Sequence, residues 1–164
     1  MFDIRKYLKN PLVLILLFNI ILLYFSFFRL STVGGQGMEP AMKNKSKFVY
    51  RKFLTDTPAL NRSELIVYTD SSGFTHIGRI IALPREAVRI ENDSIYIDTR
   101  DTTKYKLSEE YLYPSIKTTS STSGWVDVQS GSYFVLKDNN RQNVSIPSNI
   151  VKRGNIKGTI VKVL

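Results

Sequence analysis

Cysteine and histidine, which commonly serve as nucleophiles, bases or zinc ligands, are almost absent from this sequence. The chain of 164 residues contains no cysteine, which excludes disulfides, thiolate catalysis and cysteine-based zinc sites. Its single histidine, His76, cannot form a histidine cluster, so we expect neither a metal site nor a cofactor. A hydroxyl attacks poorly without a neighbouring base. His76 could be such a base, although a lone histidine is more typical of a half-exposed strand residue.

The charge of the chain indicates the kind of surface it meets. The formal net charge is +9, which suits acidic partners or an anionic cell envelope. The lysines and arginines are scattered and are not interleaved with aromatic residues, and no helix-turn-helix or RNA-binding signature is present. We therefore expect no nucleic-acid binding.

An apolar segment precedes the positions that could do chemistry. Residues Pro11–Phe28 carry no charge, and as a helix these eighteen residues would extend about 27 Å. The run is longer than the apolar core of a cleavable signal peptide, although Thr32 and Gly34 form a poor small-x-small cleavage site. The sequence therefore predicts an uncleaved transmembrane anchor.

The flanks of this segment predict its orientation. Arg5, Lys6 and Lys9 precede it, so the positive-inside tendency makes residues 1–10 a cytoplasmic tail and places residues 29–164 outside the cell membrane. Asn19 lies in the middle of the segment, where its side chain either bonds to its own helix or contacts another membrane helix. We expect a single-pass membrane protein.

The remaining residues have the composition and patterning of one mainly β domain. After the polar, glycine-rich lead Ser31–Gly37, strand patterns recur between turn residues, in the segments Lys47–Phe53, Leu65–Thr69, His76–Leu83, Val88–Ile97, Tyr133–Leu136 and Gly158–Leu164. Alternation on both sides of Asn92 predicts a hairpin within Val88–Ile97. Residues 99–131 are expected to form a polar flap or insertion.

Several motifs resemble type I signal peptidases, and they occur in the order found in that family. The residues Gly35-Gln-Gly-Met-Glu-Pro-Ala-Met42 are similar to the family motif Gly-x-Ser-Met-x-Pro-Thr-Leu. His76-Ile-Gly-Arg-Ile-Ile-Ala-Leu-Pro-Arg-Glu86 resembles Tyr-Val-Lys-Arg-Val-Ile-Gly-Leu-Pro-Gly-Asp. Tyr133-Phe-Val-Leu-Lys-Asp-Asn139 resembles Tyr-Phe-Val-Leu-Gly-Asp-Asn. Weaker matches are Lys45–Phe53, Arg62–Tyr68 and Asn155–Gly158. The resemblance implies an antiparallel β-sheet or barrel domain after the anchor.

This sequence departs from the family at both positions that carry the chemistry. The family removes signal peptides with a serine nucleophile and a lysine base, and the resemblance places Gly37 at the first position and Gly78 at the second. Glycine supplies neither an attacking oxygen nor a proton-accepting nitrogen. The late family block that orients the lysine is also absent from Arg141–Ser148. We therefore expect an inactive homologue with no catalytic residue.

The flanks of these glycines still follow the family pattern and predict a groove for an extended peptide. Its candidate residues are Gly35, Gln36, Gly37, Met38, Pro40, His76, Gly78, Ile80 and Leu83. Degenerate relatives of this kind accompany pilus genes in Gram-positive bacteria, so the resemblance implies an accessory or chaperone of pilus assembly that binds secreted or pilin-like proteins.

Two other readings remain open. One is an active peptidase with relocated catalytic residues, which would use His76. The other is a structural subunit that holds a partner's membrane helix through Asn19. The sequence gives no oligomeric state.

Overall fold

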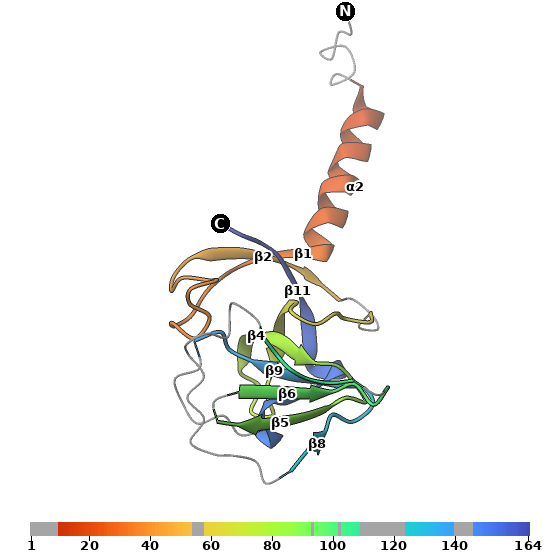
Figure 1. Cartoon of the computed structure of the whole chain (residues 1–164). Helices are drawn as coiled ribbons and strands as arrows, with labels where there is room; N and C mark the ends of the chain where they lie inside the picture. The colour runs from red at the N-terminus through yellow and green to blue at the C-terminus, as the bar shows by residue number, and fades with distance from the viewer. Residues whose placement is uncertain (1–9, 54–57, 93, 102, 109–123, 140–145) are drawn as a thin grey trace, which may run out of the picture.

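In its described residues the chain forms one α-helix and two antiparallel sheets, as the computed structural model of Figure 1 shows. The structure describes residues 10–53, 58–92, 94–101, 103–108, 124–139 and 146–164. Residues 102 and 109–123 of the expected polar segment lie outside these ranges.

The apolar segment forms helix α2, Pro11–Phe27, which stands apart from the sheets (Figure 1). The Asn10 side chain caps it by accepting a hydrogen bond from the Leu12 backbone nitrogen at 3.0 Å. Its end differs from the expected one, because Phe28 is extended and pairs with Arg51 on a neighbouring strand. Asn19 donates a hydrogen bond to the Ile15 carbonyl of its own helix at 2.8 Å. In the described part of the chain, no helix combines the length and apolar character needed to cross a membrane.

The first sheet has seven strands in the order β1-β2-β11-β3-β4-β9-β10. Their bounds are β1 Phe28–Thr32, β2 Lys47–Lys52, β3 Leu65–Thr69, β4 Thr75–Ala82, β9 Ser132–Leu136, β10 Ile150–Lys152 and β11 Ile156–Val163. Two short 3-10 helices, η2 Pro147–Asn149 and η3 Arg153–Asn155, flank β10. All described pairings are antiparallel. The sheet is open, with β1 and β10 at its edges.

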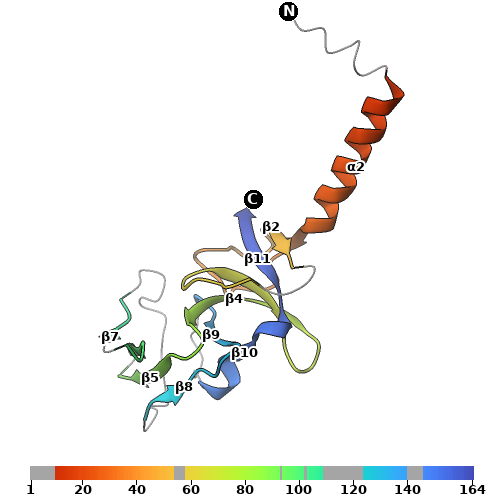
Figure 2. The same cartoon turned by 90° about the vertical axis from the view of Figure 1, so that its right-hand side faces the viewer.

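The second sheet has four strands in the order β7-β6-β5-β8 and lies on the far side of the first sheet from α2 (Figure 2). Its strands are β5 Ala87–Glu91, β6 Ser94–Asp98, β7 Lys104–Lys106 and β8 Val126–Asp127. The expected hairpin is confirmed, because β5 pairs with β6 in a register that sets Ile90 opposite Ile95. The outer strands β7 and β8 fall within the segment expected to be a flap.

Because successive side chains of a strand point to opposite faces of its sheet, the buried residues form separate clusters on these faces. The largest cluster joins the second sheet to β9 through residues such as Ile90, Ile97 and Phe134. A second cluster around Ile66, Ile80 and Val135 covers one face of the first sheet. A third cluster contains Val33, Met38, Met42, Phe48 and Val67. The loop that carries the first family motif is therefore anchored in the core by its apolar residues.

Candidate functional site

A pocket of about 550 Å³ lies where the glycine-rich loop after β1 meets the start of β4 and the end of β9. We call it the Gly37 pocket. Val33, Met38, Phe48, Val67 and Ile77 give it apolar walls, while His76 and Lys137 are its basic side chains. No described residue that lines it is acidic. The pocket is therefore a partly apolar cavity with a positive charge at Lys137.

Backbone contacts with the end of β9 hold the glycine-rich loop in place. The Asn139 backbone nitrogen donates to the Gly37 carbonyl at 2.9 Å, and its side-chain amide donates to the Gln36 carbonyl at 3.1 Å. On the other side, the Gly35 nitrogen donates to Asn44 Oδ1 at 3.0 Å. Gly35 has a φ of +87°, which favours glycine in this turn. The loop is thus joined to residues about a hundred positions away in sequence.

A buried ion pair fixes the end of β9 itself. Arg79 on β4 contacts both oxygens of Asp138, with Nε–Oδ1 at 2.8 Å and Nη2–Oδ2 at 2.6 Å. The Asp138 side chain is 1% exposed and that of Arg79 is 12% exposed. Bidentate pairing satisfies the two charges that burial would otherwise penalise. Asp138 therefore positions its neighbours Lys137 and Asn139 against the loop.

Gly37 lies directly beside the Lys137 side chain. A Cβ atom added to Gly37 would lie 2.9 Å from Lys137 Cδ and 3.7 Å from Cε and Cγ. The lysine chain thus occupies the space into which a side chain at position 37 would extend. Because Lys137 is flexible and exposed, that space can be cleared by moving it.

The surroundings of Gly78 are more rigid than those of Gly37. Gly78 sits on β4 opposite Ile66, and an added Cβ atom would lie 2.5 Å from Val135 Cγ1 and 3.1 Å from the Leu136 carbonyl oxygen. Both neighbours belong to buried strand β9. Gly78 does not line the Gly37 pocket, so the structure does not bring the two glycines together as walls of one cavity.

His76 is paired with an acid that sequence reasoning did not single out. Its Nε2 lies 2.7 Å from Asp70 Oδ2, and its ring lies 5.6 Å from that of Tyr68. The hydrogen bond from His76 lowers the pKa of Asp70, and the backbone N–H groups of Phe74 and Ser72 lower it further against an opposing effect of burial. Burial, aided by the charge of Asp70, raises the pKa of Tyr68.

The remaining predicted groove residues are divided between pocket, core and surface. Gly35, Gln36 and Met38 line the Gly37 pocket with Gly37 and His76. Pro40 is exposed within the turn after Gly37, and Ile80 is fully buried in the core. Ile80 lies there because it is paired with Val135 of β9 and belongs to the same buried cluster.

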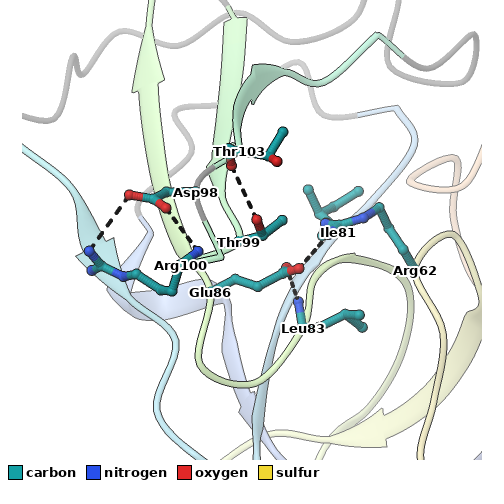
Figure 3. A network of polar contacts seen from close by, with 8 residues as sticks. All are labelled: Arg62, Ile81, Leu83, Glu86, Asp98, Thr99, Arg100 and Thr103. Carbon is teal, nitrogen blue, oxygen red and sulfur yellow. Dashed lines mark hydrogen bonds and ion pairs between the residues drawn. The ribbon is translucent and has the colours of Figure 1, made fainter.

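Leu83 is part of a rigid turn and not of the pocket. Its backbone nitrogen donates to Glu86 Oε2 at 2.7 Å, and Glu86 Oε1 pairs with Arg62 Nη2 at the same distance (Figure 3). Arg62 also donates to the Ile81 carbonyl. The network joins the ends of β4 and β5, and so it holds the two sheets together.

Sequence reasoning missed three residues that shape the site, namely Asp70, Lys137 and Asp138. Asp138 and Lys137 stand inside a quoted motif, but their contacts depend on strand pairing. Within the described residues, no three histidine, cysteine, aspartate or glutamate side chains gather as metal ligands.

Comparison with known proteins shows the family of the chain. The family described as signal peptidase, peptidase S26, matches residues 4–162. The chain belongs to this family. It is 31% identical over 132 residues to signal peptidase I U of Bacillus subtilis, with 76% of this chain and 66% of that protein covered. It is 27% identical over 157 residues to signal peptidase I P of Bacillus subtilis subsp. natto, with 87% of this chain and 82% of that protein covered.

A solved structure of a family member shows a partial likeness. The crystal structure of a signal peptidase I from Enterococcus faecalis V583 covers 65% of this chain and all of its own, at 24% identity and a TM-score of 0.48. The mainly β, antiparallel fold expected from the sequence is observed.

Proposed function

We propose that this chain is a member of the signal peptidase family that binds a secreted polypeptide outside the cytoplasm without cleaving it. The observation that carries the proposal is the environment of the two glycines. The motifs align Gly37 with the nucleophile and Gly78 with the base, and Val135 takes up the space that any side chain at position 78 would need. A lysine base in the family position is incompatible with this packing.

The residues that line the Gly37 pocket support the binding of a polypeptide. The Gly37 pocket has apolar walls for small side chains and a glycine-rich rim whose backbone is held in place. An extended segment lying there would gain apolar contacts without meeting a nucleophile at position 37. We propose that its ligand is a secreted or pilin-like polypeptide, and that the protein assists pilus assembly at the cell surface.

We also propose that helix α2 inserts into the cell membrane. Its large apolar side chains are exposed all round, from 39% for Phe27 to 73% for Leu12, which is costly in water. The positive charges of Arg5, Lys6 and Lys9 before the helix support an extracytoplasmic domain through the positive-inside tendency. Protease added to intact, wall-stripped cells should degrade the domain and spare the amino-terminal tail. A protected domain would contradict this location.

Cleavage and capture test the main proposal separately. Purified full-length protein in detergent micelles, given a secretory precursor peptide, should cleave it no faster than buffer. A photocrosslinking residue at Gln36, on the rim of the pocket, should capture a secreted protein in cells. The same residue at exposed Lys106, on the second sheet, is the matched control. Equal capture at both positions would contradict binding at the pocket.

One observation favours a second function, an active peptidase with relocated residues. His76 is paired with Asp70 and lines a pocket that also contains the hydroxyls of Ser31, Thr32 and Thr75. A base oriented by an acid supplies two of the three members of a hydrolytic triad. Among the described residues, however, no hydrogen bond joins His76 to a hydroxyl. Cleavage that is lost in His76→Ala would establish this function and overturn the first.

A further inference from the structure

The Gly37 pocket contains a cation that the family's chemistry does not account for. Lys137 follows β9 directly and lines the pocket, with its aliphatic chain lying along Gly37. In the family motif quoted above, the matching position is glycine. Two departures from the family motifs, at positions 37 and 137, therefore meet in space.

The steric contact explains why these two positions would change together. A serine Cβ at position 37 would lie 2.9 Å from Lys137 Cδ, closer than the roughly 3.5–4.0 Å of ordinary carbon contacts. Glycine at position 37 leaves space for the aliphatic chain of Lys137, which lines the pocket. The loss of the nucleophile position and the gain of a positive charge are thus linked by geometry.

Three acids that lie close in sequence to residues lining the pocket already have partners. Asp138 is held by Arg79, Asp70 by His76, and Glu39 Oε1 accepts from the Asn44 backbone nitrogen at 3.3 Å. No acidic residue lines the pocket in the described part of the chain, and no described carboxylate lies within ion-pair distance of Lys137. The pocket is therefore complementary to a negative charge brought by a ligand.

We propose that Lys137 is a specificity residue that pairs with an aspartate or glutamate side chain of the polypeptide bound in the Gly37 pocket. This inference rests on the proposed function, and it specifies that the bound polypeptide carries an acidic side chain. The carboxylate belongs to a side chain because an extended segment that passes along the pocket has its own terminus elsewhere. Apolar walls beside the charge select a sequence in which an acidic residue neighbours small apolar ones.

The test uses short peptides whose only carboxylate is a side chain. A fluorescent alanine- and valine-based peptide, acetylated and amidated at its ends, carries one glutamate that is moved along successive positions. A matched set carries glutamine instead. Affinities for the full chain in detergent micelles are measured by fluorescence anisotropy. At one position, glutamate should bind about five-fold more tightly than glutamine, as expected for one partly exposed ion pair.

Three variants separate the role of the charge from general effects. Lys137→Met should abolish the preference for glutamate and leave the glutamine peptides bound as before, whereas Lys137→Arg should retain the preference. Lys106→Met, which removes an exposed lysine on the second sheet, should change nothing. Gly37→Ser should weaken the preference by displacing the Lys137 chain. Gly154→Ser should not, because Gly154 lies outside the pocket and nothing lies within 4 Å of an added Cβ there.

The outcomes distinguish this inference from the function on which it rests. If both peptide sets bind equally at every position, or if Lys137→Met keeps the preference, the role of Lys137 is overturned while peptide binding stands. If neither set binds, both are overturned. A preference that appears only when the peptide terminus is a free carboxylate would assign the pocket to chain ends and overturn the side-chain proposal.

Discussion

Replacement of Gly78 by alanine tests whether the packing around β4 has closed the position of the family base. The added Cβ atom would meet Val135 Cγ1 at 2.5 Å, the Leu136 carbonyl oxygen at 3.1 Å and Tyr68 Cε1 at 3.3 Å. Carbon atoms pack at about 3.5–4.0 Å, so the first contact is about 1 Å too short. Val135 is 1% exposed on β9, which pairs with both β4 and β10 and has little freedom to move.

Overpacking of this kind costs about 1–3 kcal/mol. It opposes the gain of about 0.4–1 kcal/mol that alanine brings over glycine by restricting the unfolded chain. We therefore expect Gly78→Ala to lower the free energy of unfolding by roughly 1–2 kcal/mol, and Gly78→Lys to lower it further. Gly34→Ala is the matched control, because nothing lies within 4 Å of its added Cβ atom. It should be neutral or slightly stabilising.

Urea unfolding of the full chain in detergent micelles, followed by the fluorescence of the only tryptophan, Trp125, measures these changes. A double-mutant cycle with Val135→Ala tests the cause. In that background, Gly78→Ala should cost at least 0.5 kcal/mol less, because the clashing methyl group is gone. An unchanged stability of Gly78→Ala, or an equal cost in both backgrounds, would refute the argument that Val135 fills this position.

Two further predictions concern charged groups around the site. Asp138→Asn should lower the free energy of unfolding by about 3–5 kcal/mol in the same urea assay, because it removes the buried counter-charge of Arg79. The control Asp127→Asn, which removes an exposed partner of Arg100, should cost less than about 1 kcal/mol. Similar costs for the two variants would contradict the anchoring role of Asp138. The lowered pKa of Asp70 stabilises the folded state above the pKa of the unfolded chain, and this contribution is lost as the pH falls from about 5 through the folded-state pKa. Asp70→Asn should therefore be less stable than wild type at pH 7 and should lose less stability on acidification, a difference that urea midpoints at pH 7, 4 and 3 would reveal; parallel acid profiles would contradict it.

Local patterns in the sequence predicted most of the long strands. Leu65–Thr69 is β3 to the residue, and the segments predicted at Lys47–Phe53 and Tyr133–Leu136 differ from β2 and β9 by a single residue. These strands are predictable because alternation of apolar and polar side chains is a property of neighbouring residues. The family resemblance also rested on short, contiguous motifs, and the match over residues 4–162 shows that family.

Elements that depend on a distant partner were missed or misplaced. The sequence predicted a continuation of the apolar helix at Phe28 and a glycine-rich lead from Ser31, but Phe28, Ser31 and Thr32 belong to β1, which pairs with β2. The short strands β7, β8 and β10 have too few residues to alternate recognisably. These strands form because neighbouring strands supply their hydrogen-bond partners, and their own composition does not indicate them.

The sequence by itself determined that residues 37 and 78 are glycines, and hence that neither side chain of a serine and lysine pair is present there. Tertiary structure decided which side chains contact those two positions. Only the pairing of β4 with β9 brings Val135 over Gly78, and only the hydrogen bond of Asn139 to the loop brings Lys137 beside Gly37. These partners lie 57 to 103 positions apart along the chain, because the register of an antiparallel sheet, and not local periodicity, sets which side chains meet.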